Sequence, residues 1–279
     1  MSDHLAPGLY IVATPIGNLS DLSARAAATL RGVSLILAED KRVTAKLLAF
    51  VEATAPMALY HDHSSEAERT RILARLASEA VALVSDAGTP LISDPGYKLV
   101  RAARAAGHAV HTIPGACAAI AALTLAGLPT DRFLFAGFLP AKAKARADSI
   151  AELAAIRASL VFYESGPRLG ESLAALADGL GQRDAAVIRE ISKLHEETVT
   201  GLLAELAARY AHAPPRGEIV IVVGPPAEQQ AASDDELDSA LRAALATQTP
   251  SRAAKEVAER LNIPRKRAYA RALVLGDGS

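Results

Sequence analysis

Three loops of this sequence combine glycine and proline with polar side chains directly after apolar, β-branched runs. The segment SDAGTPLISDPG (85–96) holds two Gly, two Pro and two Asp. This composition restricts the backbone and so fixes the positions of its amides and carbonyls. A rigid loop of this kind suits recognition of an adenosine or an amino acid, so we predict a binding loop here. In ATPIGNL (13–19) and IPGAC (113–117), glycine lets the backbone approach a ligand. An ordinary turn between a strand and a helix explains ATPIGNL equally well.

Ionisable side chains follow two further apolar runs. AEDKR (38–42) contains Asp40 and Arg42, and FYESGPRL (162–169) contains Glu164. A carboxylate in such a place can accept a proton from a hydroxyl substrate. A solvated helix start is an equally good explanation of AEDKR, because acidic side chains favour the first turn of a helix.

Several common kinds of site are missing from the sequence. There is no GxxxxGK(S/T) loop for nucleotide phosphates and no GxGxxG turn for a dinucleotide. HDH (61–63) lacks an obvious third metal ligand and Cys117 is the only cysteine, so we predict no metal site and no intramolecular disulfide. No apolar run reaches the ~18 residues of a membrane span, and the N-terminus has no secretion-signal pattern. We therefore predict a cytoplasmic protein with no membrane partner.

The apolar runs alternate with helical patterns. The expected strands are 9–13, 33–38, 81–84, 109–113, 133–138, 160–163, 185–191 and 218–223. Ser20 or Asp21 can cap the first helix, and Ser65 with Glu68 has the pattern of a capping box. The alternation favours a largely parallel sheet covered on both faces. Because the pattern restarts near residue 123, we predict an α/β fold of two lobes, residues 8–120 and 121–224, with a small-molecule site in the cleft between them.

The C-terminal part differs in composition. Residues 225–236 are polar, acidic and without periodicity, which predicts a linker, and residues 237–279 show helical patterns only. Seven Lys or Arg and two Glu lie between Ser251 and Arg271, although the whole chain has a net charge of −1. Thr249 and Pro250 begin a helix, and the outline resembles a helix-turn-helix.

Cations that open the last helix predict a phosphate-binding surface, because a helix N-terminus attracts anions. A merely soluble helix face is the alternative. We predict an RNA-binding tail, extended by cations near residue 144. The predicted RNA-binding residues are Lys142, Lys144, Arg146, Arg265, Lys266, Arg267 and Arg271.

Seven motifs in order resemble one known family. TPIGNL, AED-R, HDH, SDAGTPLISDPG, GLPTDRF, GFLP and FYES follow one another between about Gly8 and Val223. They resemble the tetrapyrrole methylase superfamily and, within it, the family of ribosomal RNA small subunit methyltransferase I. The resemblance implies two α/β lobes with S-adenosylmethionine folded in the cleft between them, and usually a homodimer. It also implies methyl transfer to the 2′-oxygen of a cytidine in 16S ribosomal RNA.

The resemblance assigns cofactor-binding residues position by position. The family usually has Thr at position 41 and Pro-His at positions 166 and 167, whereas this chain has Lys41, Gly166 and Pro167. These departures affect expected substrate contacts more than the cofactor loops. The residues that match the cofactor loops are Pro15, Gly17, Asn18, Gly88, Thr89, Pro90, Ile92, Ser93, Pro114, Gly115, Cys117, Ala118 and Tyr163.

Methyl transfer to a hydroxyl depends mainly on alignment, which supplies on the order of 7–11 kcal/mol. Removal of the hydroxyl proton adds typically ~10²–10⁴-fold. We predict Asp40, Asp86 and Glu164 as candidates for the base, with Arg42 binding a phosphate or orienting a carboxylate.

The expected partner is 16S rRNA within the 30S subunit, and not DNA, which lacks the 2′-hydroxyl. Two alternatives stay open. One is a methyltransferase of the same fold that acts on a tetrapyrrole or another small molecule. The other is a non-enzymatic ribosome-assembly factor.

Overall fold

The computed structural model describes residues 5–227, 233–261 and 263–276. It divides into two compact units, Met1–Pro226 and Ala227–Ser279. The first unit contains two lobes, each built on a five-stranded sheet. None of the described helices is long and apolar enough to cross a membrane.

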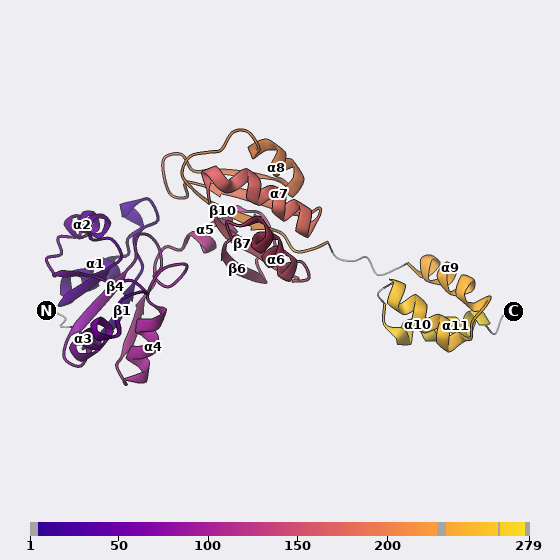
Figure 1. The fold of residues 1–279 in the computed structure, drawn as a ribbon, viewed down its shortest axis with the longest axis horizontal. Coiled ribbons are helices and arrows are strands. Elements are labelled where there is room, and N and C mark those ends of the chain that lie inside the picture. The colour runs from indigo at the N-terminus through magenta and orange to yellow at the C-terminus, as the bar shows by residue number, and fades with distance from the viewer. Residues whose placement is uncertain (1–4, 228–232, 262, 277–279) are drawn as a thin grey trace. The chain divides into compact units, whose positions relative to one another are not determined.

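The sheet of the first lobe is entirely parallel, as the sequence pattern predicts. Its strands lie in the order β3-β2-β4-β1-β5. Helices α1 and α2 cover one face and α3 and α4 the other (Figure 1). The strands are β1 (Gly8–Val12), β2 (Leu35–Ala38), β3 (Met57–Leu59), β4 (Ala80–Val84) and β5 (Val110–Ile113), and the helices are α1 (Ala24–Gly32), α2 (Lys41–Phe50), α3 (Glu66–Leu76) and α4 (Tyr97–Ala105).

Alternation of side chains along β1 explains the two covered faces. Tyr10 and Val12 pack in the cluster that contains the residues of α1 and α2, whereas Leu9 and Ile11 pack with those of α3 and α4. Successive side chains of a strand point to opposite faces, so a strand buried on both faces is apolar at every position. All five residues of β1 are buried.

The sheet of the second lobe is mostly antiparallel, so the expectation of a largely parallel sheet is wrong here. Its order is β6-β7-β10-β8-β9, and only β6 and β7 are parallel. Helices α6, α7 and α8 cover one face, while α5 packs on the other. The elements are α5 (Ala118–Leu125), β6 (Phe133–Phe138), α6 (Ala143–Leu153), β7 (Ser159–Ser165), α7 (Leu169–Leu180), β8 (Asp184–Arg189), β9 (Glu197–Leu202), α8 (Leu203–Tyr210) and β10 (Glu218–Val223).

Hydrogen bonds correct one local expectation and confirm another. The first helix starts after Ser23, whose Oγ accepts from the Ala26 amide at 3.0 Å, and not after Ser20 or Asp21. Those two residues lie in a short 3-10 helix, Leu19–Asp21, capped by Asn18. The predicted capping box of Ser65 and Glu68 is confirmed.

The predicted boundary between residues 120 and 121 falls inside α5. Ala119, Ala122 and Leu123 of this helix are buried against the second sheet. The helix therefore belongs to the second lobe by its packing, although it follows the last strand of the first lobe.

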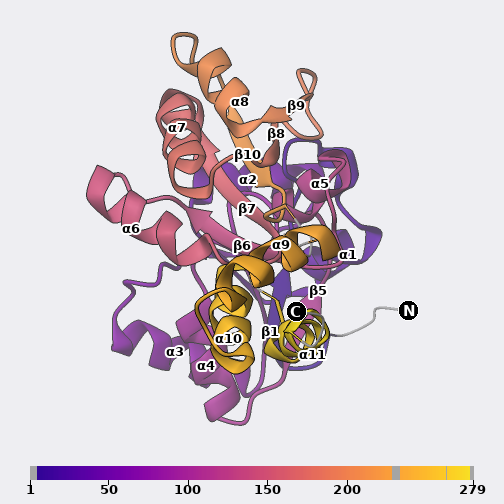
Figure 2. The same ribbon diagram turned by 90° about the vertical axis from the view of Figure 1, so that its right-hand side faces the viewer.

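The second unit is a group of three helices with its own apolar core (Figure 2). Ser233 caps α9 by a capping box with Glu236, so this helix begins inside the predicted linker 225–236; residues 228–232 of that linker lie outside the described residues. The predicted helix start at Pro250 is confirmed. The helices are α9 (Asp234–Leu245), α10 (Pro250–Leu261) and α11 (Arg265–Gly276).

Candidate active site

A cavity of about 420 Å³ opens in the first unit and is lined by residues of both lobes. Glu39 and Asp86 border it just after β2 and β4, the edge of a parallel sheet where ligands bind. Its volume lies within the range of small-molecule sites. The lining residues are Ile16, Glu39, Asp86, Ala87, Gly88, Thr89, Ile92, Ser93, Asp94, Ala118, Phe138, Tyr163, Glu164, Ser165, Ile191, Gly217, Glu218, Ile219 and Val220.

Backbone and side-chain hydrogen bonds join the three glycine-rich loops predicted from the sequence. Thr14 and Gly88 form an isolated bridge, with N–O distances of 2.8 and 3.1 Å. The Thr89 hydroxyl donates to the Ala116 carbonyl at 2.9 Å. The first loop and the turn after β5 are therefore both fixed to the segment 85–96.

The segment 85–96 holds strained backbone next to the cavity. Leu91 and Ser93 adopt φ values of 75° and 63°, in the left-handed region that non-glycine residues rarely occupy. Such strain persists only where the surrounding structure holds it, and it concentrates at functional sites. Asp62 of the HDH motif helps to hold the end of this segment, because its Oδ1 accepts from the Gly96 amide at 2.9 Å.

Six of the predicted cofactor residues line the cavity. The predicted loop 85–96 supplies four of these six residues, and the second lobe's helix and strand supply the others. They are Gly88, Thr89, Ile92, Ser93, Ala118 and Tyr163. For the remaining seven, a cofactor contact stays a prediction: they are Pro15, Gly17, Asn18, Pro90, Pro114, Gly115 and Cys117.

Two glycines that we predicted to approach a ligand are required by packing against protein. A Cβ at Gly115 would lie 2.9 Å from that of Ala13. A Cβ at Gly17 would lie 2.8 Å from Cε of Lys193 and closer still to its Cγ. Contact between neighbouring loops therefore explains both glycines.

An aromatic group closes one side of the cavity. The Tyr163 ring meets Phe135 and Phe138 edge-on, with centroid distances of 4.8 and 5.6 Å. The Tyr163 hydroxyl accepts from the Ala119 amide at 3.2 Å in the first turn of α5. Burial raises the pKa of Tyr163, so its hydroxyl stays protonated. Tyr163 is therefore a rigid wall between α5 and the second sheet.

Asp40 is poorly suited to the role of a base. It caps α2, and its carboxylate accepts from the Arg42 amide at 2.8 Å and from the Arg42 guanidinium at 2.7 Å. These hydrogen bonds from Arg42 lower the pKa of Asp40 to about 2. The Arg42 side chain is 91% exposed, and orienting a carboxylate is one of its two predicted roles.

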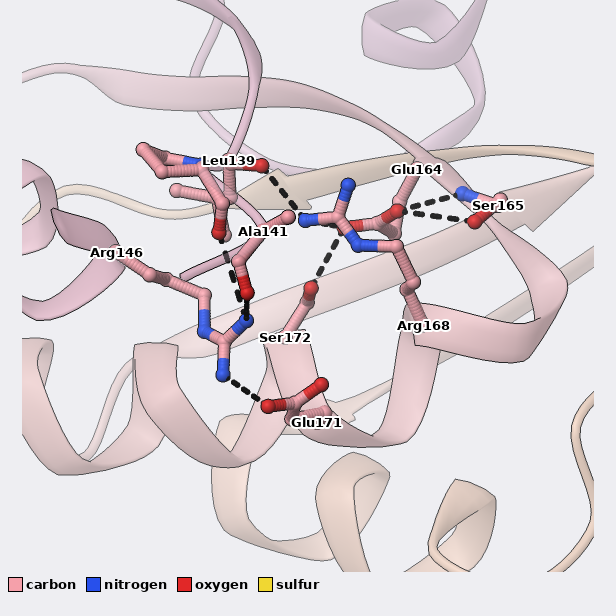
Figure 3. Close-up of polar contacts among 9 residues, drawn as sticks. Leu139, Ala141, Arg146, Glu164, Ser165, Arg168, Glu171 and Ser172 are labelled. Atoms are coloured by element: carbon pink, nitrogen blue, oxygen red, sulfur yellow. Dashed lines mark hydrogen bonds and ion pairs between the residues drawn. The ribbon is translucent and has the colours of Figure 1, made fainter. Parts of the chain in front are cut away.

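Glu164 lines the cavity, yet its carboxylate is bound by neighbours within the second lobe (Figure 3). Its side chain is 1% exposed and accepts from the Ser172 hydroxyl at 2.6 Å and the Ser165 amide at 2.8 Å. Arg168 lies 3.5 Å from Glu164 and donates to the Leu139 carbonyl at 2.6 Å. Glu164 thus links β7 to the segment that follows Phe138.

Arg146 does not lie on an RNA-binding surface, which corrects its predicted role. Its side chain is 4% exposed and pairs with Glu171 (Figure 3). It also donates to the Ala141 carbonyl at 3.3 Å. In contrast, Lys144 is 88% exposed beside Asp148, and Lys142 is exposed at the start of α6.

Two carboxylates at the cavity were missing from our prediction. Glu39 and Asp94 lie within the motifs that we singled out, and they line the cavity together with Asp86. Burial raises the pKa of Glu39, and the negative charges of Asp94 and Asp86 raise it further. Burial also raises the pKa of Asp94. Asp86 accepts from the Asp40 amide at 3.0 Å.

The family departure at position 166 has a structural reason. Gly166 is buried, and a Cβ there would lie 2.9 Å from the carbonyl carbon of Pro215 and closer still to its oxygen. The segment before β10 therefore leaves no room for a side chain at this position.

The cations of α11 form two groups, one paired with acids of α9 and the other exposed at the start of the helix. Arg271 donates to both carboxylate oxygens of Asp238 at 2.5 and 2.6 Å, and Arg267 pairs with Asp234 at 2.8 Å. Both acids belong to α9, so these arginines join α11 to α9. Arg265 and Lys266 are exposed at the start of α11.

Residues 8–207 match the family model of Tetrapyrrole (Corrin/Porphyrin) Methylases. The chain belongs to the tetrapyrrole methylase family. Residues 231–276 match a second model, the RsmI C-terminal HTH domain. Both matches confirm the resemblance that the sequence motifs predict.

Similar proteins agree with this assignment. Proteins named Ribosomal RNA small subunit methyltransferase I from Erythrobacter litoralis (strain HTCC2594) and Mesorhizobium japonicum (strain LMG 29417 / CECT 9101 / MAFF 303099) are 55% and 45% identical to this chain. The first alignment covers 98% of this chain and 97% of the relative, and the second 99% and 94%.

Solved structures of low sequence identity share the fold. Diphthine synthase matches with a TM-score of 0.61 and 16% identity, covering 77% of this chain and 89% of that one. Uroporphyrin-III-C-methyltransferase from Thermus thermophilus matches with a TM-score of 0.56 and 21% identity, covering 78% and 94%.

Proposed function

We propose that this protein transfers a methyl group from S-adenosylmethionine to the ribose 2′-oxygen of a cytidine in 16S rRNA. The observation that carries the proposal is the cavity, where the three predicted cofactor loops meet beside a wall of the second lobe. Near-full-length relatives named as small-subunit rRNA methyltransferases support the choice of substrate.

The residues at the cavity fit S-adenosylmethionine by size, rigidity and charge. Hydrogen bonds between loops preorganise the backbone around Gly88 and Thr89. The carboxylates of Glu39, Asp86 and Asp94 suit a cation, and Tyr163 offers an apolar wall. When bound, the cofactor supplies an electrophilic methyl group on a positively charged sulfur.

The chain's own residues must hold the hydroxyl and accept its proton. Among the predicted bases, Asp86 is the one that both lines the cavity and lacks the tight pairing of Asp40 and Glu164. Glu39 shares the cavity, and its raised pKa makes it a stronger proton acceptor than an ordinary carboxylate. We assign proton removal to Glu39 and Asp86, and orientation of the second lobe's wall to Glu164.

The tail supplies RNA affinity in this proposal. Arg265 and Lys266 are exposed at the N-terminal end of α11, where backbone amides favour phosphate. Lys142 and Lys144 add exposed charge in the first unit. We further propose a cytoplasmic homodimer that acts on the RNA within the 30S subunit.

The test is methyl transfer from labelled S-adenosylmethionine to small-subunit particles that lack the modification, followed by nuclease mapping. We expect label as 2′-O-methylcytidine at one site. Cofactor binding without transfer to particles or to free RNA would overturn the RNA assignment and direct the search to small-molecule acceptors.

A further inference from the structure

One loop of the second lobe contacts the first loop of the first lobe. It spans residues 190–196 between β8 and β9. The Ser192 hydroxyl donates to the carboxylate of Asp21. The aliphatic chain of Lys193 lies against Gly17, so that a Cβ at Gly17 would be 2.8 Å from Lys193 Cε. The two lobes therefore meet here through a hydrogen bond and through close packing.

Lys193 is fixed at its other end by two carboxylates of the second lobe. Its Nζ lies 3.0 Å from Glu190 Oε1 and 2.9 Å from Glu218 Oε2. Glu190 Oε1 also accepts from the Glu218 amide at 3.1 Å. The hydrogen bond from Lys193 lowers the pKa of Glu190, so the pair stays charged near neutral pH. An ammonium group with two partners restricts the side chain that lies against Gly17.

The backbone of this loop is strained in the same place. Glu190 and Ser192 have φ values of 51° and 65°, in the left-handed region. Strain of this kind is kept only where the surrounding contacts hold it, and it often accompanies function. Here it places Lys193 and Ser192 toward the first lobe, while Leu194 at the tip is 92% exposed.

The partners of Lys193 are direct neighbours of the cavity. Ile16 precedes Gly17 and lines the cavity from the first lobe. Glu218 and Gly217 line it from the second lobe, and so does Ile191. Lys193 therefore lies between residues that border the cavity from the two lobes.

We propose that Lys193 is a positioning residue, which holds the two lobes at the separation that the cofactor cavity requires. Its aliphatic chain spaces the loop at Gly17, and its ammonium group fixes Glu218 on the opposite wall. This inference rests on the proposed function, because it takes S-adenosylmethionine as the ligand of the cavity.

The test compares Lys193→Ala, Lys193→Arg and Gly17→Ala with the matched surface control Lys46→Ala. S-adenosylhomocysteine alone is titrated into each full-length variant by calorimetry, and the thermal midpoint is measured without ligand. We expect Lys193→Ala and Gly17→Ala to weaken binding at least tenfold. Lys193→Arg should recover part of the loss because it keeps a charge, and the control should bind like the wild type.

The double variant Gly17→Ala/Lys193→Ala separates positioning from general damage. Removal of the lysine chain relieves the overlap with the new methyl group, although the Gly17 backbone at φ 158° still disfavours a side chain, so the double variant should lose less than the two single losses multiplied. The proposal would be overturned if the losses of the two single variants multiplied in the double variant. It would also be overturned if Lys193→Ala bound S-adenosylhomocysteine with wild-type affinity. If the wild type itself does not bind S-adenosylhomocysteine, the proposed function fails instead.

Discussion

Glu164 offers a sharp test of whether a cavity carboxylate is chemical or structural. Replacement by glutamine keeps the shape and one acceptor oxygen, but it removes the charge that faces Arg168 and the Ser172 hydroxyl. A hydrogen bond to a charged group contributes about 1.5–3 kcal/mol. Loss of one partner of a buried pair costs about 3–5 kcal/mol. Because Arg168 is 31% exposed, we expect the lower end of that range. Glu164→Gln should therefore lower the free energy of unfolding by about 3 kcal/mol.

Urea unfolding of the full-length chain measures this loss. The chain has no tryptophan, so tyrosine emission follows the transition. The control is Asp148→Asn, whose pair with Lys144 is exposed on both sides and contributes at most about 0.5 kcal/mol. The reasoning is refuted if Glu164→Gln is as stable as the control and loses ~10²–10⁴-fold in turnover, because Glu164 would then be the base.

Four further outcomes follow from the site and the tail. Asp40→Asn should keep turnover within about threefold, since hydrogen bonds from Arg42 hold the pKa of Asp40 at about 2; a larger loss at unchanged cofactor affinity contradicts this. In the wild type, kcat/KM should fall as pH drops through the raised pKa of Glu39, and Glu39→Gln should flatten that limb of the pH profile. Arg271→Gln should lower the stability of the tail, measured by helix melting, through loss of its Asp238 pair. Lys266→Gln should leave stability unchanged and reduce the salt dependence of RNA binding by about one unit of slope.

Loop composition predicted one wall of the cavity well. SDAGTPLISDPG lies at the cavity because glycine, proline and aspartate in one short segment limit the backbone to few conformations. The strands of the first lobe were also predictable, since runs of apolar residues mark strands that are buried on both faces. The short strand β3 was missed because two half-buried residues and one exposed residue give no pattern.

The direction of individual side chains could not be read from the sequence. Asp40 and Glu39 are adjacent, yet Glu39 lines the cavity while Asp40 turns to cap α2. Arg146 has the charge of an RNA contact, but the packing of α6 against α7 buries it beside Glu171. The pairing of Lys193 with Gly17 joins positions far apart in the chain, which no local pattern indicates.

The antiparallel pairing of the second sheet also had no local signal. An apolar run such as 218–223 has the same composition in either orientation, and the connection that decides it is the hairpin from β8 to β9. The strand β9 alternates between exposed and half-buried residues, so its apolar content is too low to predict it by composition.

Strand order also determines when each sheet can be completed during synthesis on the ribosome. The first sheet is complete once β5 has been made, whereas the second sheet needs β10, its last strand in sequence, between β7 and β8. At ordinary rates of synthesis, the interval between the completion of β5 and that of β10 lasts on the order of 5–20 seconds. In the last part of that interval, after β8 has been made and before β10 follows, β7 and β8 carry unpaired edges, which are prone to association with other chains. Because residues 217–220 line the cavity, a nascent chain acquires its complete cavity only after nearly all of the first unit has been synthesised.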